Sequence, residues 1–145
     1  MYNILVINGP NINMLGKREP EVYGKDNYLT IMEELKLYGE KKGFKIDTFQ
    51  SNIEGEIINR IHSAMGSYDY IILNPGAYTH TSIAIRDALL SVNIPFIEIH
   101  ISNIFAREPF RHHSYLSDKA IGIISGFGKH SYLLAIDFLE KIRDE

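Results

Sequence analysis

A glutamate and a histidine, two positions apart, form a candidate chemical pair in this chain of 145 residues. Glu98 and His100 close an apolar run that begins at Phe96, which predicts a buried strand on which the two side chains share one face. A neighbouring carboxylate fixes the tautomer of an imidazole and favours its protonated form. His100 is therefore a candidate general acid near neutral pH. A structural Glu–His hydrogen bond is the alternative, although burying a charged pair without a purpose is costly.

A second candidate pair, Arg18 and Tyr23, lies in the stretch 8–24, which also contains Asn11. The glycines and prolines of this stretch exclude a long helix and predict a loop longer than most connections. A free tyrosine, with a pKa of about 10, is a poor base at neutral pH, but a guanidinium against the phenol oxygen lowers that pKa. The pair could then take a proton from carbon. A surface arginine beside a packed aromatic is the simpler interpretation of the pair alone. We interpret the stretch as a mobile active-site lid.

Four basic residues gather in the segment 101–118, directly after the strand of His100: Arg107, Arg111, His112 and His113. The planar fork of arginine donors suits carboxylates and hydroxyl-rich ligands. The segment therefore predicts a site for a small anionic substrate, and a solvated loop is the alternative. Adjacent histidines need not point the same way, and the helical motif H-E-x-x-H is absent, so we predict no metal site.

Polar residues also open the helix expected over 83–92. Residues 79–82 read Thr-His-Thr-Ser, with His80 second. Free amides and hydroxyls at a helix start can hold a carboxylate or hydroxyl groups. Plain helix capping is the alternative, and both can hold at once. Asp87, near the middle of the helix, is expected to be exposed.

Strands and helices alternate along the whole chain. Expected strands are 4–8, 44–50, 70–73, 95–100 and 120–124, and expected helices are about 28–42, 54–65, 83–92 and 129–143. This alternation predicts a single α/β domain over 1–145, with a five-stranded parallel sheet covered by helices on both faces. Ligands of such folds bind outside the carboxyl ends of the strands. The candidate residues converge on that edge.

The second expected helix has its own start signal. Ser51-Asn52-Ile53-Glu54 matches a capping box. Apolar side chains then recur at helical spacing and are expected on one face of the helix: Ile53, Ile57, Ile58, Ile61 and Met65.

Composition narrows the function classes. The net charge of −3 argues against nucleic acid as a partner. The chain has no cysteine, which excludes disulfides and a thiol nucleophile. Neither a signal peptide nor an apolar run of roughly 20 residues is found, so we expect no membrane partner and a cytoplasmic location.

Seven stretches together carry a family resemblance: 8–11, 15–24, 49–52, 74–82, 86–88, 98–103 and 107–114. In order and spacing they resemble type II 3-dehydroquinate dehydratase over nearly the whole chain. The resemblance implies a flavodoxin-like three-layer fold and anti elimination of water from 3-dehydroquinate, giving 3-dehydroshikimate, either in the shikimate pathway of aromatic amino-acid biosynthesis or in quinate breakdown. It implies no cofactor, no metal and a homo-oligomer, a dodecamer built from trimers. Ile53 stands where the family would have a histidine, and no implied role falls on it.

The resemblance also assigns catalytic roles. Tyr23 would be the base that removes a proton beside the ketone, and Arg18 would lower its pKa. Asn11 would position a water that stabilises the enolate. His100, oriented by Glu98, would protonate the departing hydroxyl.

The resemblance places seven further residues around the substrate. Asn74 and the backbone of Ile101 and Ser102 would bind its carboxylate, and His80 and Arg111 would bind its ring hydroxyls. Arg107 would help to hold the lid, and Asp87 would reach into the neighbouring subunit's site. The rival interpretation is a flavodoxin-like module that binds a flavin or a phosphorylated ligand at the same sheet edge. The first loop argues against it, because it is not rich in the Ser, Thr and Gly amides that cradle phosphate.

Overall fold

The computed structural model describes residues 1–17 and 26–145. Its strands are β1 (Tyr2–Asn8), β2 (Phe44–Gln50), β3 (Tyr70–Asn74), β4 (Phe96–His100) and β5 (Gly122–Ser125). Its α-helices are α2 (Tyr28–Lys41), α3 (Glu54–Ser63), α4 (Ile83–Val92) and α5 (His130–Arg143). Short 3₁₀ turns are η1 (Ile12–Met14), η2 (Gly76–His80), η3 (Ile104–Ala106) and η4 (Pro109–Arg111).

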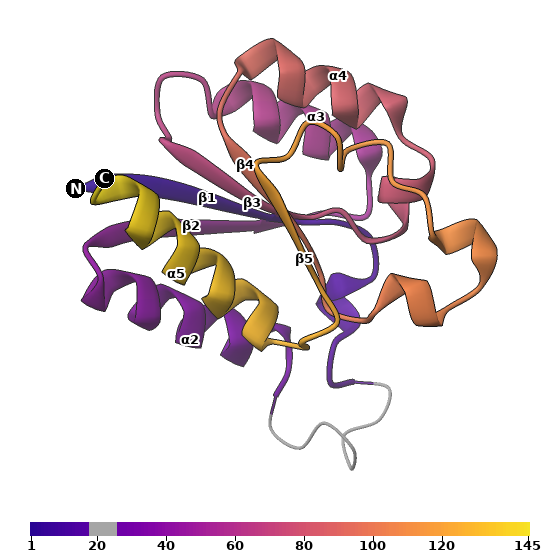
Figure 1. The fold of residues 1–145 in the computed structure, drawn as a ribbon, viewed down its shortest axis with the longest axis horizontal. Coiled ribbons are helices and arrows are strands. Elements are labelled where there is room, and N and C mark those ends of the chain that lie inside the picture. Colours follow the sequence, from indigo (N-terminus) through magenta and orange to yellow (C-terminus); the bar gives the residue numbers. More distant parts are fainter. Residues whose placement is uncertain (18–25) are drawn as a thin grey trace.

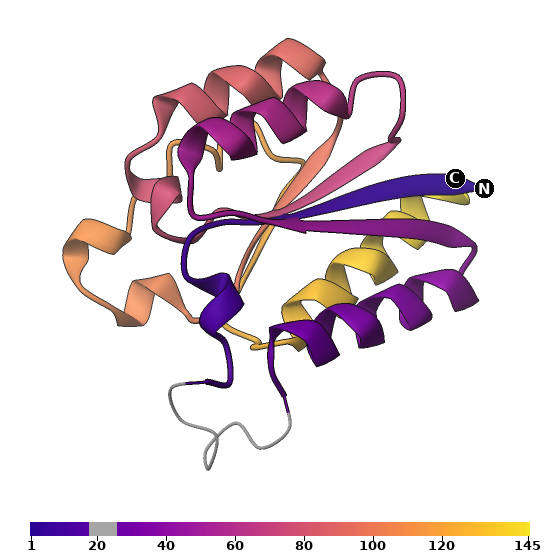
Figure 2. The ribbon, with the colours of Figure 1, turned by 180° about the vertical axis from the view of Figure 1, so that it is seen from behind.

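The five strands form one parallel sheet in the order β2-β1-β3-β4-β5. This is the flavodoxin-like order of a doubly wound fold, so the predicted fold class is confirmed. Helices α2 and α5 cover one face of the sheet, and α3 and α4 cover the other (Figure 1 and Figure 2).

The central strand β1 shows why the sheet needs both helical layers. Ile4 and Val6 pack in the core on the side of α2 and α5, and Leu5 and Ile7 pack on the side of α3 and α4. All four are fully buried. A strand buried on both faces reads as a continuous apolar run rather than an alternating one, and this run predicted the strand.

Helix α2 begins and ends where its sequence signals lie. The Asn27 side chain accepts a hydrogen bond from the Thr30 backbone N–H, and the Thr30 hydroxyl accepts one from the Asn27 N–H. This reciprocal pair satisfies amides that a helix start leaves free. Gly43, with φ +86°, follows the helix end, in the left-handed conformation that glycine adopts without strain.

The start of α3 differs from the prediction. Its N-cap is Ile53, which has no side-chain hydrogen bond. Ser51 accepts from the Ile53 N–H and donates to Glu56, so no capping box with Glu54 forms. The predicted apolar face is also too wide, because Ile53 and Met65 are 59% exposed. They lie just outside the two ends of the helix, where no neighbouring element covers them.

Four strands differ in their bounds from the prediction. β1 begins at Tyr2 rather than at residue 4, and β3 ends at Asn74 rather than at residue 73. β4 begins at Phe96 rather than at residue 95. β5 covers Gly122–Ser125 rather than 120–124. The Ala120 N–H donates to the Leu116 carbonyl in a turn, the Ile121 N–H donates to the Phe96 carbonyl of β4, and the register with β4 begins at Gly122.

The turns after β1 and β3 interlock. The Gly9 N–H donates to the Asn74 carbonyl across 2.7 Å. A β-carbon at Gly9 would lie 2.3 Å from the Pro75 carbonyl oxygen, and one at Gly76 would lie 3.0 Å from the Pro10 oxygen. The two backbones therefore touch where only glycine fits. We define these turns, residues 8–11 and 74–77, as the paired turns.

In the described ranges, 1–17 and 26–145, no helix has the length and apolar character needed to cross a membrane.

Candidate active site

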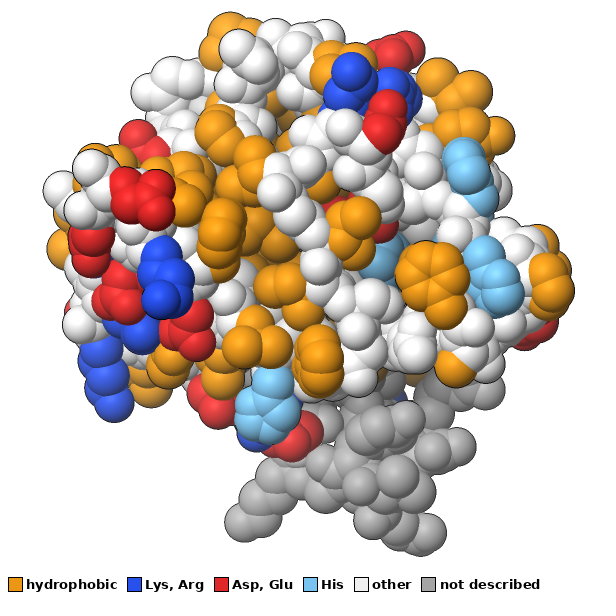
Figure 3. All heavy atoms as spheres, in the orientation of Figure 1, with side chains coloured by type: hydrophobic (Ala, Val, Ile, Leu, Met, Phe, Trp, Pro, Cys, Tyr) orange, Lys and Arg blue, Asp and Glu red, His pale blue; other side chains and the backbone are white. Residues whose placement is uncertain are grey.

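The carboxyl ends of the parallel strands meet at one edge of the sheet, and the 3₁₀ turns gather there. η1 follows β1, η2 follows β3, and η3 and η4 follow β4; Figure 1 shows them together at the end of the sheet opposite the labelled chain termini. In the space-filling view, histidine side chains lie mainly on this side of the molecule (Figure 3). The edge therefore collects the polar segments that the sequence singled out.

Glu98 and His100 lie side by side at the end of β4, as their spacing predicted. His100 Nε2 lies 2.5 Å from Glu98 Oε2, and the two residues are 5% and 0% exposed. Because an ionised carboxylate only accepts hydrogen bonds, Nε2 carries a proton and donates it to Glu98. The second ring nitrogen, Nδ1, has no hydrogen-bond partner within the described part of the chain.

Three hydroxyl groups complete the surroundings of the Glu98 carboxylate. The Ser117 hydroxyl donates to Oε1 at 2.8 Å. The hydroxyls of Ser114 and Thr79 lie 3.1 Å from Oε1 and 3.3 Å from Oε2, and they share a hydrogen bond of 2.5 Å with each other. Burial acts to raise the pKa of Glu98, but hydrogen bonds from His100 and the serines outweigh it, so that the pKa is lowered. Glu98 is thus held ionised inside the protein, where it accepts the hydrogen bond from His100.

Sequence reasoning gave no role to these three hydroxyls. Ser114 and Thr79 fall inside two of the stretches that carry the family resemblance, and Ser117 falls outside all of them. Serine and threonine in turns ordinarily bond to nearby backbone, so neither residue type nor spacing distinguished them.

The lowered pKa of Glu98 predicts a specific loss of stability in acid. Stability from a carboxyl whose folded pKa is depressed is present above its unfolded value, 4.5, and is lost as pH falls through the lower folded value. We expect Glu98→Gln to be less stable than the original chain at neutral pH, with the difference shrinking below about pH 4.5. Urea unfolding across this pH range measures it. Glu40→Gln, on an exposed position of α2, is the control, and equal pH slopes in both variants would contradict the assignment.

Asn74 ends β3, and Asn11 lies in the turn that follows the neighbouring strand β1. The Asn74 amide is 2% exposed; its Oδ1 accepts from the Gly76 N–H at 3.3 Å and its Nδ2 donates to Tyr132 at 3.0 Å. Asn11 adopts a left-handed conformation, with φ 70°, and its backbone N–H donates to Asn52 Oδ1 at 3.0 Å. Both residues are thus fixed at the edge where the parallel strands end.

The segment 101–118 is tied to η2 and α4. His80 Nδ1 lies 2.8 Å from the His113 carbonyl. Because a carbonyl only accepts, Nδ1 carries a proton, and in the neutral ring Nε2 is the acceptor. Arg86 donates to the Tyr115 carbonyl at 2.8 Å. Arg111 is partly buried and donates from Nε to Glu108 at 2.8 Å, which leaves its terminal nitrogens for other partners.

The other predicted binding residues occupy varied settings. Ile101 and Ser102 follow His100 directly, and their backbone N–H groups donate to no acceptor among the residues described. Arg107 is half-exposed, with Nε 3.9 Å from Glu108. Asp87 is exposed on α4, as expected. Arg18 and Tyr23 lie outside the described residues.

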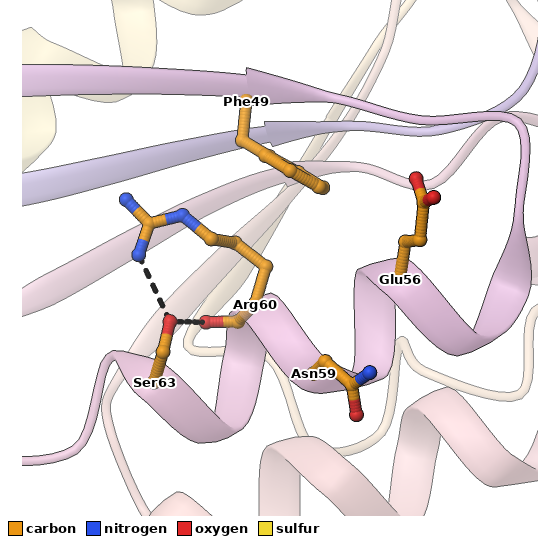
Figure 4. A pocket seen from close by; sticks show the side chains of 5 residues that line it. All are labelled: Phe49, Glu56, Asn59, Arg60 and Ser63. Atoms are coloured by element: carbon orange, nitrogen blue, oxygen red, sulfur yellow. Dashed lines mark hydrogen bonds between the residues drawn. The ribbon is translucent and has the colours of Figure 1, made fainter.

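Two surface hollows border these elements. One, of about 490 Å³, is lined by Ile83, Arg86, His113, Ser114, Tyr115 and Asp118, and through Ser114 it adjoins the surroundings of Glu98. The other, of about 310 Å³, lies between β2 and α3 and is lined by Phe49, Glu56, Asn59, Arg60 and Ser63 (Figure 4). It contains none of the predicted site residues. The hollow between β2 and α3 is therefore separate from the candidate active site.

In residues 1–17 and 26–145, no group of three or more His, Asp or Glu side chains is placed to hold a metal ion.

Comparison with known proteins identifies the family. The family model of dehydroquinase class II matches residues 2–140. A 3-dehydroquinate dehydratase of Haemophilus ducreyi is 60% identical over 138 residues, covering 95% of this chain and 96% of the relative. A catabolic 3-dehydroquinase of Emericella nidulans is 59% identical over 135 residues, covering 93% and 88%.

The fold leads to the same family. The crystal structure of a type II dehydroquinase from Butyrivibrio crossotus matches with a TM-score of 0.89 at 48% identity, covering 95% of this chain and 97% of that one. The family match favours an enzyme over the rival ligand-binding module. As its motifs predicted, the chain therefore belongs to the class II dehydroquinase family of enzymes.

Proposed function

We propose that the chain catalyses the reversible anti dehydration of 3-dehydroquinate to 3-dehydroshikimate through an enolate. The named activities of its relatives support this substrate. The observation that carries the mechanism is the buried pair of Glu98 and His100 at the end of β4. Because Nε2 of His100 is engaged by Glu98, Nδ1 is the nitrogen that gives its proton to the departing hydroxyl, which leaves as water.

Residues of the segment after β1 carry out the first half of the reaction. Tyr23, as phenolate, takes the proton from the carbon beside the ketone, and the electron pair of that C–H bond forms the enolate. Arg18 favours the phenolate by its positive charge. Asn11, held at the edge by its hydrogen bond to Asn52, positions a water against the enolate oxygen. Collapse of the enolate then expels the hydroxyl toward His100.

The remaining contacts hold the substrate ring. Asn74 and the backbone N–H groups of Ile101 and Ser102 bind the carboxylate, which suits free amides beside a strand end. His80 and Arg111 bind the ring hydroxyls, since neutral His80 offers Nε2 as an acceptor and the terminal nitrogens of Arg111 have no hydrogen-bond partner among residues 1–17 and 26–145. Arg107 holds the closed lid. No cofactor or metal takes part in this proposal.

The proposal includes a homo-oligomer, a dodecamer built from trimers, in which Asp87 reaches the neighbouring subunit's site. Asp87 is exposed on α4, and Ile83 and Leu90, one turn before and after it, are 55% and 46% exposed. An acid flanked by exposed apolar side chains suits an interface better than open solvent. The enzyme acts in the shikimate pathway toward chorismate and the aromatic amino acids, or in quinate breakdown, in the cytoplasm.

A direct assay tests the function. Adding 3-dehydroquinate should produce the ultraviolet absorbance of a conjugated enone, because dehydration places a new double bond next to the ketone. Turnover should survive EDTA, and borohydride added with substrate should not inactivate the enzyme, since no lysine Schiff base forms. Absence of the enone signal would refute the activity, and covalent trapping by borohydride would refute the mechanism.

A further inference from the structure

A buried tyrosine on the last helix links the two strand-end asparagines. Tyr132, on α5, is fully buried, and its hydroxyl lies between Asn8 at the end of β1 and Asn74 at the end of β3. Asn8 and Asn74 are register partners in the sheet. We call these three residues the Asn8–Tyr132–Asn74 triad. None of the seven family stretches contains Tyr132, and no role in the proposed reaction falls on it.

The hydrogen bonds within the Asn8–Tyr132–Asn74 triad have a fixed direction. Asn8 approaches the Phe49 backbone carbonyl at 3.4 Å, and because a carbonyl only accepts, the approaching atom is the amide nitrogen. The opposite atom of Asn8 is then Oδ1, to which the Tyr132 hydroxyl donates. Burial raises the pKa of the Tyr132 hydroxyl above its usual value, so the proton that this donation requires stays in place.

A hydroxyl has one proton, so Tyr132 can only accept from Asn74. The Asn74 atom facing Tyr132 is therefore Nδ2, at 3.0 Å. The Gly76 N–H independently requires Oδ1 on the other side, at 3.3 Å. Both ends thus orient the Asn74 amide in the same way. Among the described residues, the second N–H of Nδ2 has no acceptor, which leaves it for a ligand.

We propose that Tyr132 is a positioning residue, which orients the Asn74 amide so that it presents an N–H donor, and not its carbonyl oxygen, to the substrate carboxylate. This inference rests on the proposed function, in which Asn74 binds that carboxylate. An amide flipped by 180° would place an oxygen against an anion, which repels it. A carboxamide ligand, which can both donate and accept, would adapt to either orientation.

The test compares Tyr132→Phe with the original chain. We expect the KM for 3-dehydroquinate to rise about tenfold while kcat changes less than about threefold. Competitive inhibition by quinate should weaken about tenfold, and inhibition by quinamide, which lacks the negative charge, by less than about twofold. Tyr38→Phe, which removes a hydroxyl on α2 that donates to Asp137 on α5 at 2.5 Å, is the matched control and should change inhibition by neither compound.

Combining the variant with Asn74→Ala separates positioning from general packing. In the Asn74→Ala background, Tyr132→Phe should leave the KM unchanged, because nothing remains to be oriented. An unchanged KM in the single variant, or equal weakening of quinate and quinamide, would overturn the inference. If Tyr132→Phe fails to fold, Asn8→Ala answers the same question: it frees the Tyr132 proton to turn toward Asn74, and should weaken quinate more than quinamide. If the original chain does not turn over 3-dehydroquinate, the proposed function fails instead.

Discussion

Replacing Tyr23 with Phe should lower kcat by roughly 10²- to 10⁴-fold, the usual contribution of a positioned acid or base, while KM changes less than about threefold. The phenol oxygen is the proposed base, and the substitution removes that atom alone. Steady-state rates, followed through the enone absorbance, measure the effect.

Tyr78→Phe is the matched control for this experiment. Its hydroxyl donates to the Asn52 carbonyl at 2.7 Å, at the same sheet edge, and has no part in the proposed chemistry. A Tyr23→Phe enzyme with a near-normal rate would reject Tyr23 as the base. Replacing Arg18 with Gln should also slow the reaction at neutral pH and move the rise of kcat toward higher pH, because the phenolate loses a neighbouring positive charge.

Replacing His100 with Ala should slow water loss by roughly 10²- to 10⁴-fold and leave enolate formation much less affected. In the proposal His100 acts only when the hydroxyl departs. The two steps are separable in D₂O, where NMR follows exchange of hydrogen at the reacting carbon while absorbance follows dehydration. Exchange should persist in the variant after dehydration has nearly stopped.

His62→Ala, on an exposed position of α3, is the control and should alter neither step. If exchange at carbon fell as far as dehydration, the acid role would be wrong and His100 would serve the first step. Glu98→Gln should show a milder form of the His100 result, since a neutral amide orients the ring but does not stabilise its positive charge.

The sequence predicted the parts of the fold that depend on simple periodicity. The run of apolar residues predicted β1, because a strand buried on both faces carries apolar side chains throughout. The alternation of side chains along a strand predicted that Glu98 and His100 lie on the same face. The capping box at Ser51 failed because the pattern does not say which residue adopts the cap conformation, and here Ile53 does. Helical periodicity likewise predicts which residues form an apolar stripe, but not how much of that stripe another element covers. Met65 belongs to the predicted stripe and is nevertheless exposed.

Contacts between distant segments were beyond such reasoning. Ser117 reaches Glu98 across 19 positions, and Tyr132 reaches Asn74 across 58. Tyr132 lies on the buried face of α5, but helical spacing in the sequence gives no hydrogen-bond partner. These partners exist because the sheet brings separate strand ends to one edge, and only the assembled topology defines which ends are adjacent.

The contact between the paired turns, Gly9 against Pro75 and Gly76 against Pro10, bears on protein engineering. Each turn fills the space in which the other would carry a side chain, so neither can be exchanged for a loop from an unrelated scaffold by itself. Chimaeras with other doubly wound proteins should therefore take residues 8–11 and 74–77 from one parent as a matched cassette.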